Sequence, residues 1–183
     1  MTQNKIILVT GMPAAGKSTF SLKLAQRLNI PCFNKDMIKE TMGDGFGSES
    51  GEVFKKGSKT TFLLMMHIAE RFLQVGQICI LESNFLHHDS EQIKILLEKY
   101  NCECLTFMFG GNLDVLSERY FNRDTERHWV HGKAEDKETI KNYTLKTNIL
   151  EVSFGGQVIN VDATSFDKID YEGLFMAAKK FIQ

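Results

Sequence analysis

The segment from Gly11 to Thr19 has the residue types and spacing of a phosphate-binding loop. Its residues are Gly11, Met12, Pro13, Ala14, Ala15, Gly16, Lys17, Ser18 and Thr19, which match G-x-x-x-x-G-K-[ST] at every fixed position. Glycines let successive backbone amides point at one anion, and a following helix directs its positive dipole end to the same place. Lys17 would reach the outer phosphates, and the Ser18 hydroxyl would bind Mg²⁺. The pattern predicts a site for a nucleoside triphosphate rather than a simple strand-to-helix turn.

Two acidic residues follow later apolar runs and are candidates for the chemistry at that phosphate. Asp36 lies just after a short predicted strand, where a carboxylate can accept the proton of an acceptor hydroxyl or bind Mg²⁺ through water. Glu82 ends the run Ile78 to Leu81, and a carboxylate there is a candidate metal ligand. The alternatives are a helix N-cap for Asp36 and a solvated strand end for Glu82.

A basic segment in the second half of the chain is a candidate lid. Arg119, Arg123 and Arg127 recur at every fourth position and would share one face if the segment were helical. Arginines near a triphosphate can stabilise the charge of the transferring group, and a mobile segment can exclude water. We therefore predict a lid over residues 121–136. The alternative is a solvated helix face with acidic partners. The run also contains His128, Trp129, His131, Gly132 and Lys133, and those acidic neighbours are Glu118, Asp124 and Glu126.

Strands alternate with helices along the chain, which predicts a parallel sheet with helices on both faces. Residues 43–51 hold four glycines and are predicted to be a loop, His87 and His88 are predicted to precede the helix capped near Asp89, and residues 137–150 are weakly amphipathic. Ligands of such sheets bind at the carboxyl ends of the strands, so functional residues are expected after residues 10, 34, 81 and 109. The predicted strands are 5–10, 31–33, 78–81, 105–109 and 158–161, and the predicted helices include 17–28, 36–42, 52–75, 113–120 and 174–182.

Size and composition favour one cytoplasmic domain covering residues 1–183. The net charge of −1 disfavours a general nucleic-acid-binding surface. No apolar run is long enough to span a bilayer, and a strand expected within five residues of the start leaves no room for a signal peptide. The four cysteines lack zinc-site spacing and are expected to be reduced thiols. Oligomeric state has no signature in the sequence.

Four motifs together resemble the small P-loop kinases of the zeta-toxin, chloramphenicol phosphotransferase and polynucleotide 5′-kinase kind. The motifs are GMPAAGKST, NKDMIKE, LESNF and RYFNRDTERHWVHG, and the resemblance covers nearly the whole chain. Within that set, the chain looks most like bacterial kinase-like proteins grouped under an AAA-type ATP-binding domain. One departure is Glu82, which stands where many P-loop enzymes have Asp.

The resemblance implies an α/β P-loop NTPase fold, three-layer αβα, with a five-stranded parallel sheet in the order 2-3-1-4-5 and an Arg-rich lid. It implies Asp36 as the base and Arg123 or Arg127 as lid arginines. It places adenine near Asp162, Ala163 and Thr164 and against the lid base, which carries Arg119.

The sequence therefore favours an ATP- and Mg²⁺-dependent kinase that transfers the γ-phosphate to a hydroxyl of a small molecule. Lys17, Asp36, Arg123 and Arg127 would be catalytic, and Ser18 with Glu82 would serve the metal. Three alternatives stay open: a kinase of nucleic-acid 5′-hydroxyls, a regulatory ATPase without an acceptor, and a toxin-like kinase.

Overall fold

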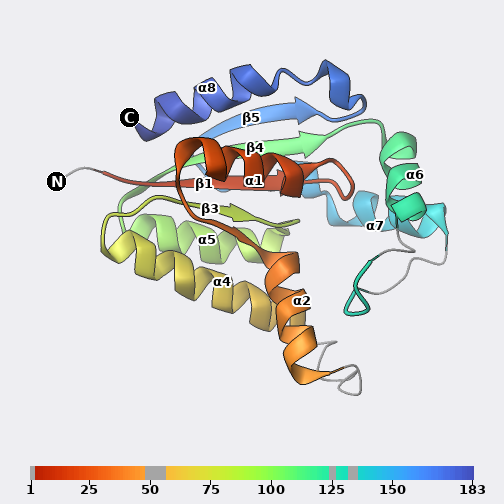
Figure 1. Ribbon diagram of the computed structural model, residues 1–183, viewed down its shortest axis with the longest axis horizontal. Helices are drawn as coiled ribbons and strands as arrows, with labels where there is room; N and C mark the ends of the chain where they lie inside the picture. The colour runs from red at the N-terminus through yellow and green to blue at the C-terminus, as the bar shows by residue number, and fades with distance from the viewer. Residues whose placement is uncertain (1–2, 48–56, 124–126, 132–135) are drawn as a thin grey trace.

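The five strands form one parallel sheet in the order β2-β3-β1-β4-β5, which confirms the expected order (Figure 1). We describe a computed structural model of the 183-residue chain over residues 3–47, 57–123, 127–131 and 136–183. All strand pairs run parallel, so the carboxyl ends meet at one edge of the sheet. The strands are β1 (Asn4–Gly11), β2 (Cys32–Asn34), β3 (Cys79–Glu82), β4 (Cys102–Gly110) and β5 (Gln157–Asp162).

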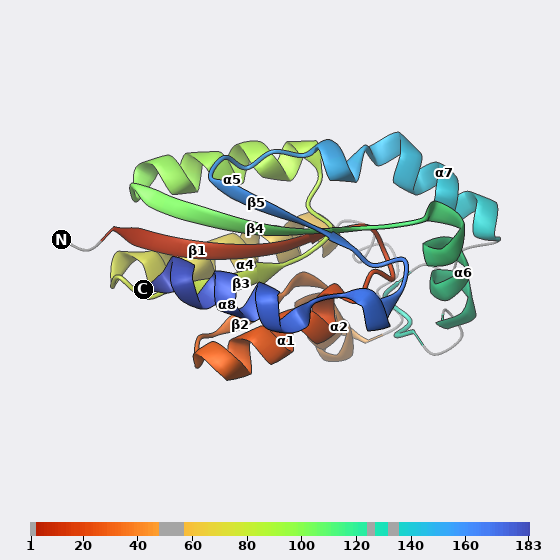
Figure 2. The ribbon, with the colours of Figure 1, turned by 90° about the horizontal axis from the view of Figure 1, so that it is seen from above.

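Helices cover both faces of the sheet and make the expected three layers (Figure 2). Alternate residues of β1 face opposite sides: Ile7 and Val9 pack with helices α1 (Lys17–Leu28) and α8 (Tyr171–Ile182). Ile6 and Leu8 pack with α4 (Gly57–Gln74) and α5 (His87–Lys99). Because β1 is buried on both faces, its sequence is a continuous apolar run instead of an alternating one.

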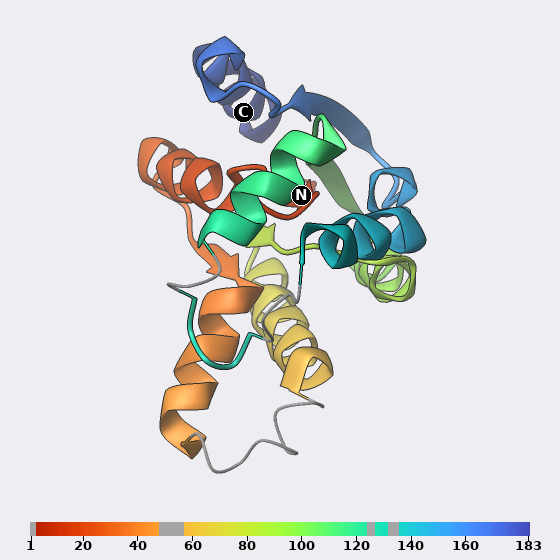
Figure 3. The ribbon, with the colours of Figure 1, turned by 90° about the vertical axis from the view of Figure 1, so that its right-hand side faces the viewer.

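Three further helices gather at the carboxyl edge of the sheet, where the candidate residues lie. These are α2 (Lys35–Phe46), α6 (Leu113–Arg123) and α7 (Lys137–Thr147). Figure 3 looks onto this edge and shows residues 127–131 between α2 and α6. Short 3₁₀ helices, Ile149–Glu151 and Phe166–Lys168, flank β5.

Several predicted boundaries are wrong. The predicted loop 43–51 begins as helix, because α2 continues to Phe46 through Gly43 and Gly45. The helix predicted to end at Tyr120 continues to Arg123, so the first three lid residues are helical. His87 and His88 open α5, and Asp89 lies inside its first turn, where its Oδ2 accepts from Leu86 N at 3.0 Å.

Two other differences concern the extent of elements. Strand β4 begins at Cys102, three residues before the prediction, because it pairs with β1 from Asn4 onward. The helix predicted over 52–75 is seen from Gly57, and positions 52–56 lie outside the described residues. Within the described ranges, no helix has the length and apolar character needed to cross a membrane.

Candidate nucleotide and phosphoryl-transfer site

The loop between β1 and α1 is held by backbone contacts that only glycine permits. Gly11 has a φ of +121°, and a Cβ there would lie 1.9 Å from the carbonyl oxygen of Phe109 on β4. This close approach lets Met12 N donate to the same oxygen at 2.8 Å. Gly16, with a φ of +83°, is the N-cap of α1. The two glycines therefore fix the loop against the sheet and turn it into the helix.

Lys17 is buried in this loop, at 6% exposure, and its Nζ donates to Met12 O at 2.7 Å. Burial lowers the Lys17 pKa from 10.5 to about 8, although the nearby carboxylates of Glu82 and Asp36 act to raise it. A desolvated ammonium at the start of a helix favours a bound anion. The loop thus has the charge and the geometry to hold phosphate.

Ser18, Asn34 and Glu82 form a hydrogen-bonded cluster beside Lys17. Ser18 Oγ donates to Glu82 Oε2 at 2.9 Å, and Asn34 Nδ2 donates to Ser18 Oγ at 3.1 Å and also to Glu82 Oε2. Glu82 is only 4% exposed, so it is no solvated strand end, and burial raises its pKa. A hydroxyl and a desolvated carboxylate side by side fit a hard divalent cation such as Mg²⁺.

Asp36 lies in the first turn of α2 and is not the helix cap. Asn34 is the N-cap, and its Oδ1 accepts from Met37 N at 2.9 Å. The Asp36 carboxylate is exposed and makes no hydrogen bond or ion pair with any residue in the described ranges. The alternative of a capping role is therefore wrong, and the carboxylate is available to a ligand.

A cavity of about 400 Å³ joins these groups at the carboxyl edge of the sheet. One wall is the phosphate loop from Pro13 to Thr19, and Asp36 and Glu82 lie beside it. The opposite wall comes from α6, α7 and the segments around Asn84 and Arg127. Its remaining residues are Tyr120, Arg123, Thr139, Ile140 and Tyr143.

Arg123 and Arg127 meet at this cavity around Tyr120. The Arg123 and Arg127 guanidinium carbons lie 5.6 and 4.7 Å from the Tyr120 ring centroid, and Arg127 Nη1 donates to the Tyr120 hydroxyl. Burial, then the neighbouring Arg127, lowers the pKa of Arg123. The predicted helical face of three arginines is wrong, because α6 ends at Arg123 and Arg127 follows in irregular structure. The tertiary structure brings the two side chains together all the same.

Residues 127–131, here called the strap, lie against α2. His131 Nε2 lies 2.8 Å from Glu40 Oε1, and His128 Nε2 lies 2.9 Å from Asp44 Oδ1. A Cβ on Gly43 would be 2.3 Å from Val130 Cγ1, so the strap touches the helix backbone. The strap thus connects Arg127 to α2, which carries Asp36 in its first turn. The rest of the predicted lid, residues 124–126 and 132–135 with Gly132 and Lys133, lies outside the described residues.

Arg119, Asp162 and Thr164 form a second cluster, next to the cavity but outside its lining. Arg119 donates to the carbonyls of Ala163 and Thr164, each at 2.6 Å, and its guanidinium stacks 4.1 Å from the Phe166 ring centroid. Asp162 Oδ1 accepts from Thr164 N at 2.9 Å. Phe166 also approaches Gly16, since a Cβ there would lie 3.1 Å from its ring. The structure therefore brings the expected adenine-side residues together beside the loop.

Sequence reasoning missed several residues of the cavity and its supports. Asn34 lies two residues before Asp36 in the same motif, and its position at the end of a strand could have identified it as a site residue. Asn84 carried only a weak signal. Tyr120, Thr139, Ile140 and Tyr143 carried none, because their helices reach the cavity only through tertiary packing. Gly11 and Met12, predicted to bind the nucleotide, do not line the cavity, and they shape the loop from behind.

The chain is similar to a solved putative kinase from Chloroflexus aurantiacus J-10-fl, with 30% identity, full coverage of both chains and a TM-score of 0.89. Two more distant structures share the fold. Kti12 from Chaetomium thermophilum in complex with ADP-AlF3 has 15% identity and a TM-score of 0.67, covering 97% of this chain and 99% of that one. A gluconokinase from Sinorhizobium meliloti 1021 has 18% identity and a TM-score of 0.60, covering 99% and 95%.

In sequence, the chain is similar to an L-seryl-tRNA(Sec) kinase from Methanococcus maripaludis, with 22% identity over 171 residues. The match covers 91% of this chain but spans only 61% of that kinase. No protein-family model matches the sequence. These comparisons support a P-loop kinase-like fold and leave the specific zeta-toxin and chloramphenicol phosphotransferase assignment unconfirmed.

Proposed function

The chain belongs to the family of the Chloroflexus aurantiacus putative kinase, and from this premise we propose that it is an ATP-dependent kinase that phosphorylates a hydroxyl group of a small molecule. The observation that carries the proposal is that the phosphate loop and the Asp36 carboxylate line the same cavity. This carboxylate belongs to α2 and is separate from Glu82, which contacts Ser18. A kinase needs such a carboxylate to accept the proton of the attacking hydroxyl.

The proposed roles follow from position in the cavity. The loop amides and Lys17 bind the triphosphate, with the adenine beside Arg119, Asp162 and Thr164. Ser18 and Glu82 would hold Mg²⁺, which supplies charge neutralisation of the phosphates when bound. Because Glu82 is desolvated and its pKa is raised, a cation beside it would restore the ionised form.

The transfer step uses groups on both sides of the phosphate. The acceptor oxygen forms a bond to the γ-phosphorus while the bond from that phosphorus to the bridging oxygen of ADP breaks. Asp36 takes the proton from the acceptor oxygen. Arg123 and Arg127, gathered at Tyr120, stabilise the charge on the transferring group.

The test is ADP formation from ATP with and without a panel of hydroxyl compounds. We expect an acceptor to raise the rate, and we expect Asp36→Asn to lower that stimulated rate by about 10² to 10⁴. Lys17→Ala should lower the stimulated rate by about 10² to 10³. Asp114→Asn, which removes an exposed carboxylate paired with Lys141 on α7, is the matched control and should keep full activity. A stimulated rate unaffected by Asp36→Asn would refute the base assignment.

A second candidate is an acceptor attached to RNA, which the similarity to the L-seryl-tRNA(Sec) kinase favours. The net charge of −1 disfavours this candidate, because RNA-binding surfaces usually carry an excess of positive charge. Adding RNA with a free 5′-hydroxyl, or an aminoacylated tRNA, to the same assay separates the candidates.

A further inference from the structure

Five residues of the cavity lining outside the phosphate loop form a group with its own chemistry, here called the chamber, and its assignment rests on the proposed kinase function. The chamber is defined by Asn84, Tyr120, Thr139, Ile140 and Tyr143. The whole cavity measures about 400 Å³, near the lower end of the range of about 300–1,000 Å³ for small-molecule sites. A second cavity of about 560 Å³ shares Ser18, Asp36, Arg123 and Arg127 with it, so an acceptor has room beside the triphosphate.

Three polar groups facing the cavity are available to a ligand. Within the described ranges, the Asp36 carboxylate, the Asn84 amide and the Tyr143 hydroxyl make no hydrogen bond. The other two chamber hydroxyls already have a hydrogen-bond partner in the protein. The Tyr120 hydroxyl accepts from Arg127, and Thr139 Oγ1 donates to Asp136 Oδ1 at 2.9 Å. Available donors and acceptors from three separate elements can bind several hydroxyl groups of one molecule.

The remaining chamber surface is apolar. Ile140 is 6% exposed overall, and the rings of Tyr120 and Tyr143 stand on neighbouring helices. Aromatic and aliphatic walls with a few placed polar groups suit a ligand with C–H faces and hydroxyl edges.

The charges in the cavity disfavour an anionic acceptor. Its cations in the described ranges are Lys17, Arg123 and Arg127, and these serve the triphosphate and its transferring group. The chamber residues themselves carry no charge, while the carboxylates of Asp36 and Glu82 lie beside it. A second anion in the chamber would compete with the triphosphate for these cations and would lie near the Asp36 carboxylate.

We infer that the acceptor is a small, uncharged polyhydroxyl compound of the sugar or polyol class, with one hydroxyl at Asp36 and others at Asn84 and Tyr143. A phosphorylated or carboxylated acceptor would add a second anion near Asp36, and a nucleic-acid end would bring phosphates to walls that carry no charge.

The experiment measures ADP formation with matched pairs of acceptors: ribose and ribose 5-phosphate, glycerol and glycerol 3-phosphate, and adenosine and AMP. An RNA oligonucleotide with a free 5′-hydroxyl completes the panel. We expect the kcat/KM of a neutral sugar or polyol to exceed that of its phosphate ester by at least about tenfold. This is the size of effect expected when one charged group lacks a hydrogen-bonding partner.

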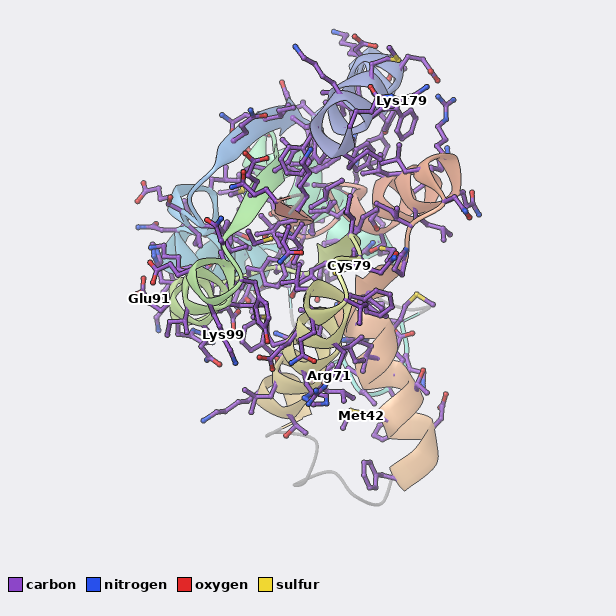
Figure 4. The ribbon with its side chains drawn as sticks, turned by 90° about the vertical axis from the view of Figure 1, so that its left-hand side faces the viewer. Met42, Arg71, Cys79, Glu91, Lys99 and Lys179 are labelled. Atoms are coloured by element: carbon purple, nitrogen blue, oxygen red, sulfur yellow. The ribbon has the colours of Figure 1, made fainter. Side chains whose placement is uncertain are left out.

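Two variants test the chamber residues directly. Tyr143→Phe removes one hydroxyl and should raise the KM for the preferred acceptor about tenfold with little change in kcat. Asn84→Lys adds a cation and should shift the preference toward the phosphate ester. The matched controls are Tyr100→Phe and Asn101→Lys, which should leave the preference unchanged. Both residues lie between Lys99, the last residue of α5 and labelled in Figure 4, and the start of β4, at the amino edge of the sheet.

The outcomes separate this inference from the proposed function. Preference for an ester or for RNA overturns the polyhydroxyl class and leaves the kinase in place. Nucleotide binding without stimulation by any acceptor refutes the kinase function and this inference with it. Stimulation by a neutral sugar or polyol, with a KM effect in Tyr143→Phe and none in Tyr100→Phe, supports both.

Discussion

The phosphate loop and the strap face each other across the cavity, and they are held in different ways. The loop is fixed by its own backbone: Met12 binds Phe109, and Gly11 allows the close approach. The strap is fixed by side chains that lie more than 80 residues away in sequence, through His131–Glu40 and His128–Asp44. A loop held by its own backbone is rigid before ligand binds, whereas a segment held by a few side-chain contacts opens at lower cost. The comparison suggests a preformed nucleotide site and an adjustable acceptor side.

Among variants of the loop and the strap, the largest effect is expected from removing the buried cation of the loop. Lys17→Met should lower kcat by about 10² to 10³, because it removes a charge aimed at the transferring phosphate. The same variant should be no less stable than the wild type in thermal unfolding, because a desolvated ammonium is replaced by a side chain of similar length. A clear loss of stability would show that Lys17 supports the fold rather than the ligand.

Gly11→Ala tests whether the loop depends on backbone approach. A Cβ 1.9 Å from the Phe109 oxygen must separate β1 from β4, so we expect a loss of about 3 kcal/mol or more in unfolding free energy. Chemical denaturation measures it. Gly155→Ala is the matched control, because Gly155 also has a positive φ, +80°, but has open space around its Cβ, so its cost should be about 1 kcal/mol.

Gly43→Ala tests the strap. The new methyl would lie 2.3 Å from Val130 Cγ1 and should push the strap and Arg127 off α2. We expect about a tenfold lower kcat with nucleotide affinity unchanged. Gly45→Ala, on the same helix with nothing within 4 Å of its Cβ, should keep full activity and gain about 0.5–1 kcal/mol of stability from helix propensity. Equal kinetics in the two variants would contradict a positioning role for the strap.

Nucleotide affinity should depend on pH through Lys17 of the loop. Lys17 has a pKa of about 8 in the free protein, and bound phosphate raises it, so binding takes up a proton above pH 8. Affinity should therefore be level with respect to this group below pH 8 and fall by up to about tenfold per pH unit above it. Calorimetry in buffers of different ionisation enthalpy measures the proton uptake, and Lys17→Met should abolish it.

The smallest effect is expected from one contact of the strap. His131→Gln keeps a donor near Glu40 but changes its reach, so we expect a two- to fivefold loss of kcat, in line with about 0.5–1 kcal/mol for a partly exposed hydrogen bond. Steady-state kinetics with saturating ATP measures it. A loss of kcat as large as that of Lys17→Met would mean that this strap contact matters for transfer as much as the loop lysine does.

Much of the fold could be read from local patterns. The five strands, the phosphate loop and the order of helices were predictable because each depends on contiguous residues: an apolar run, a Gly-rich turn or a helical stripe. The sheet order came from a family resemblance and is confirmed. Gly43 and Gly45 were misread as loop, because glycine weakens a helix locally and only the packing of Val130 on Gly43 explains its presence there.

Only part of the candidate site could be predicted from the sequence. Asp36 and Glu82 were found because parallel strands end at one edge, so residues after separate strands converge. Tyr120, Ile140 and Tyr143 were not found, because nothing in α6 or α7 marks which face turns to the cavity. Arg123 and Arg127 were paired for the wrong reason: a helical face was expected, and a shared tyrosine joins them.

The sequence by itself determined the anion cradle, since glycine, lysine and serine at fixed spacing shape nine consecutive residues through their own backbone. Only the tertiary structure decided what stands opposite that cradle. The Asp36 carboxylate, the chamber and the strap come from elements far apart in the chain, and their meeting depends on how helices pack at the sheet edge. Local conformational preference acts within a few residues, while such packing is settled by burial summed over the whole core.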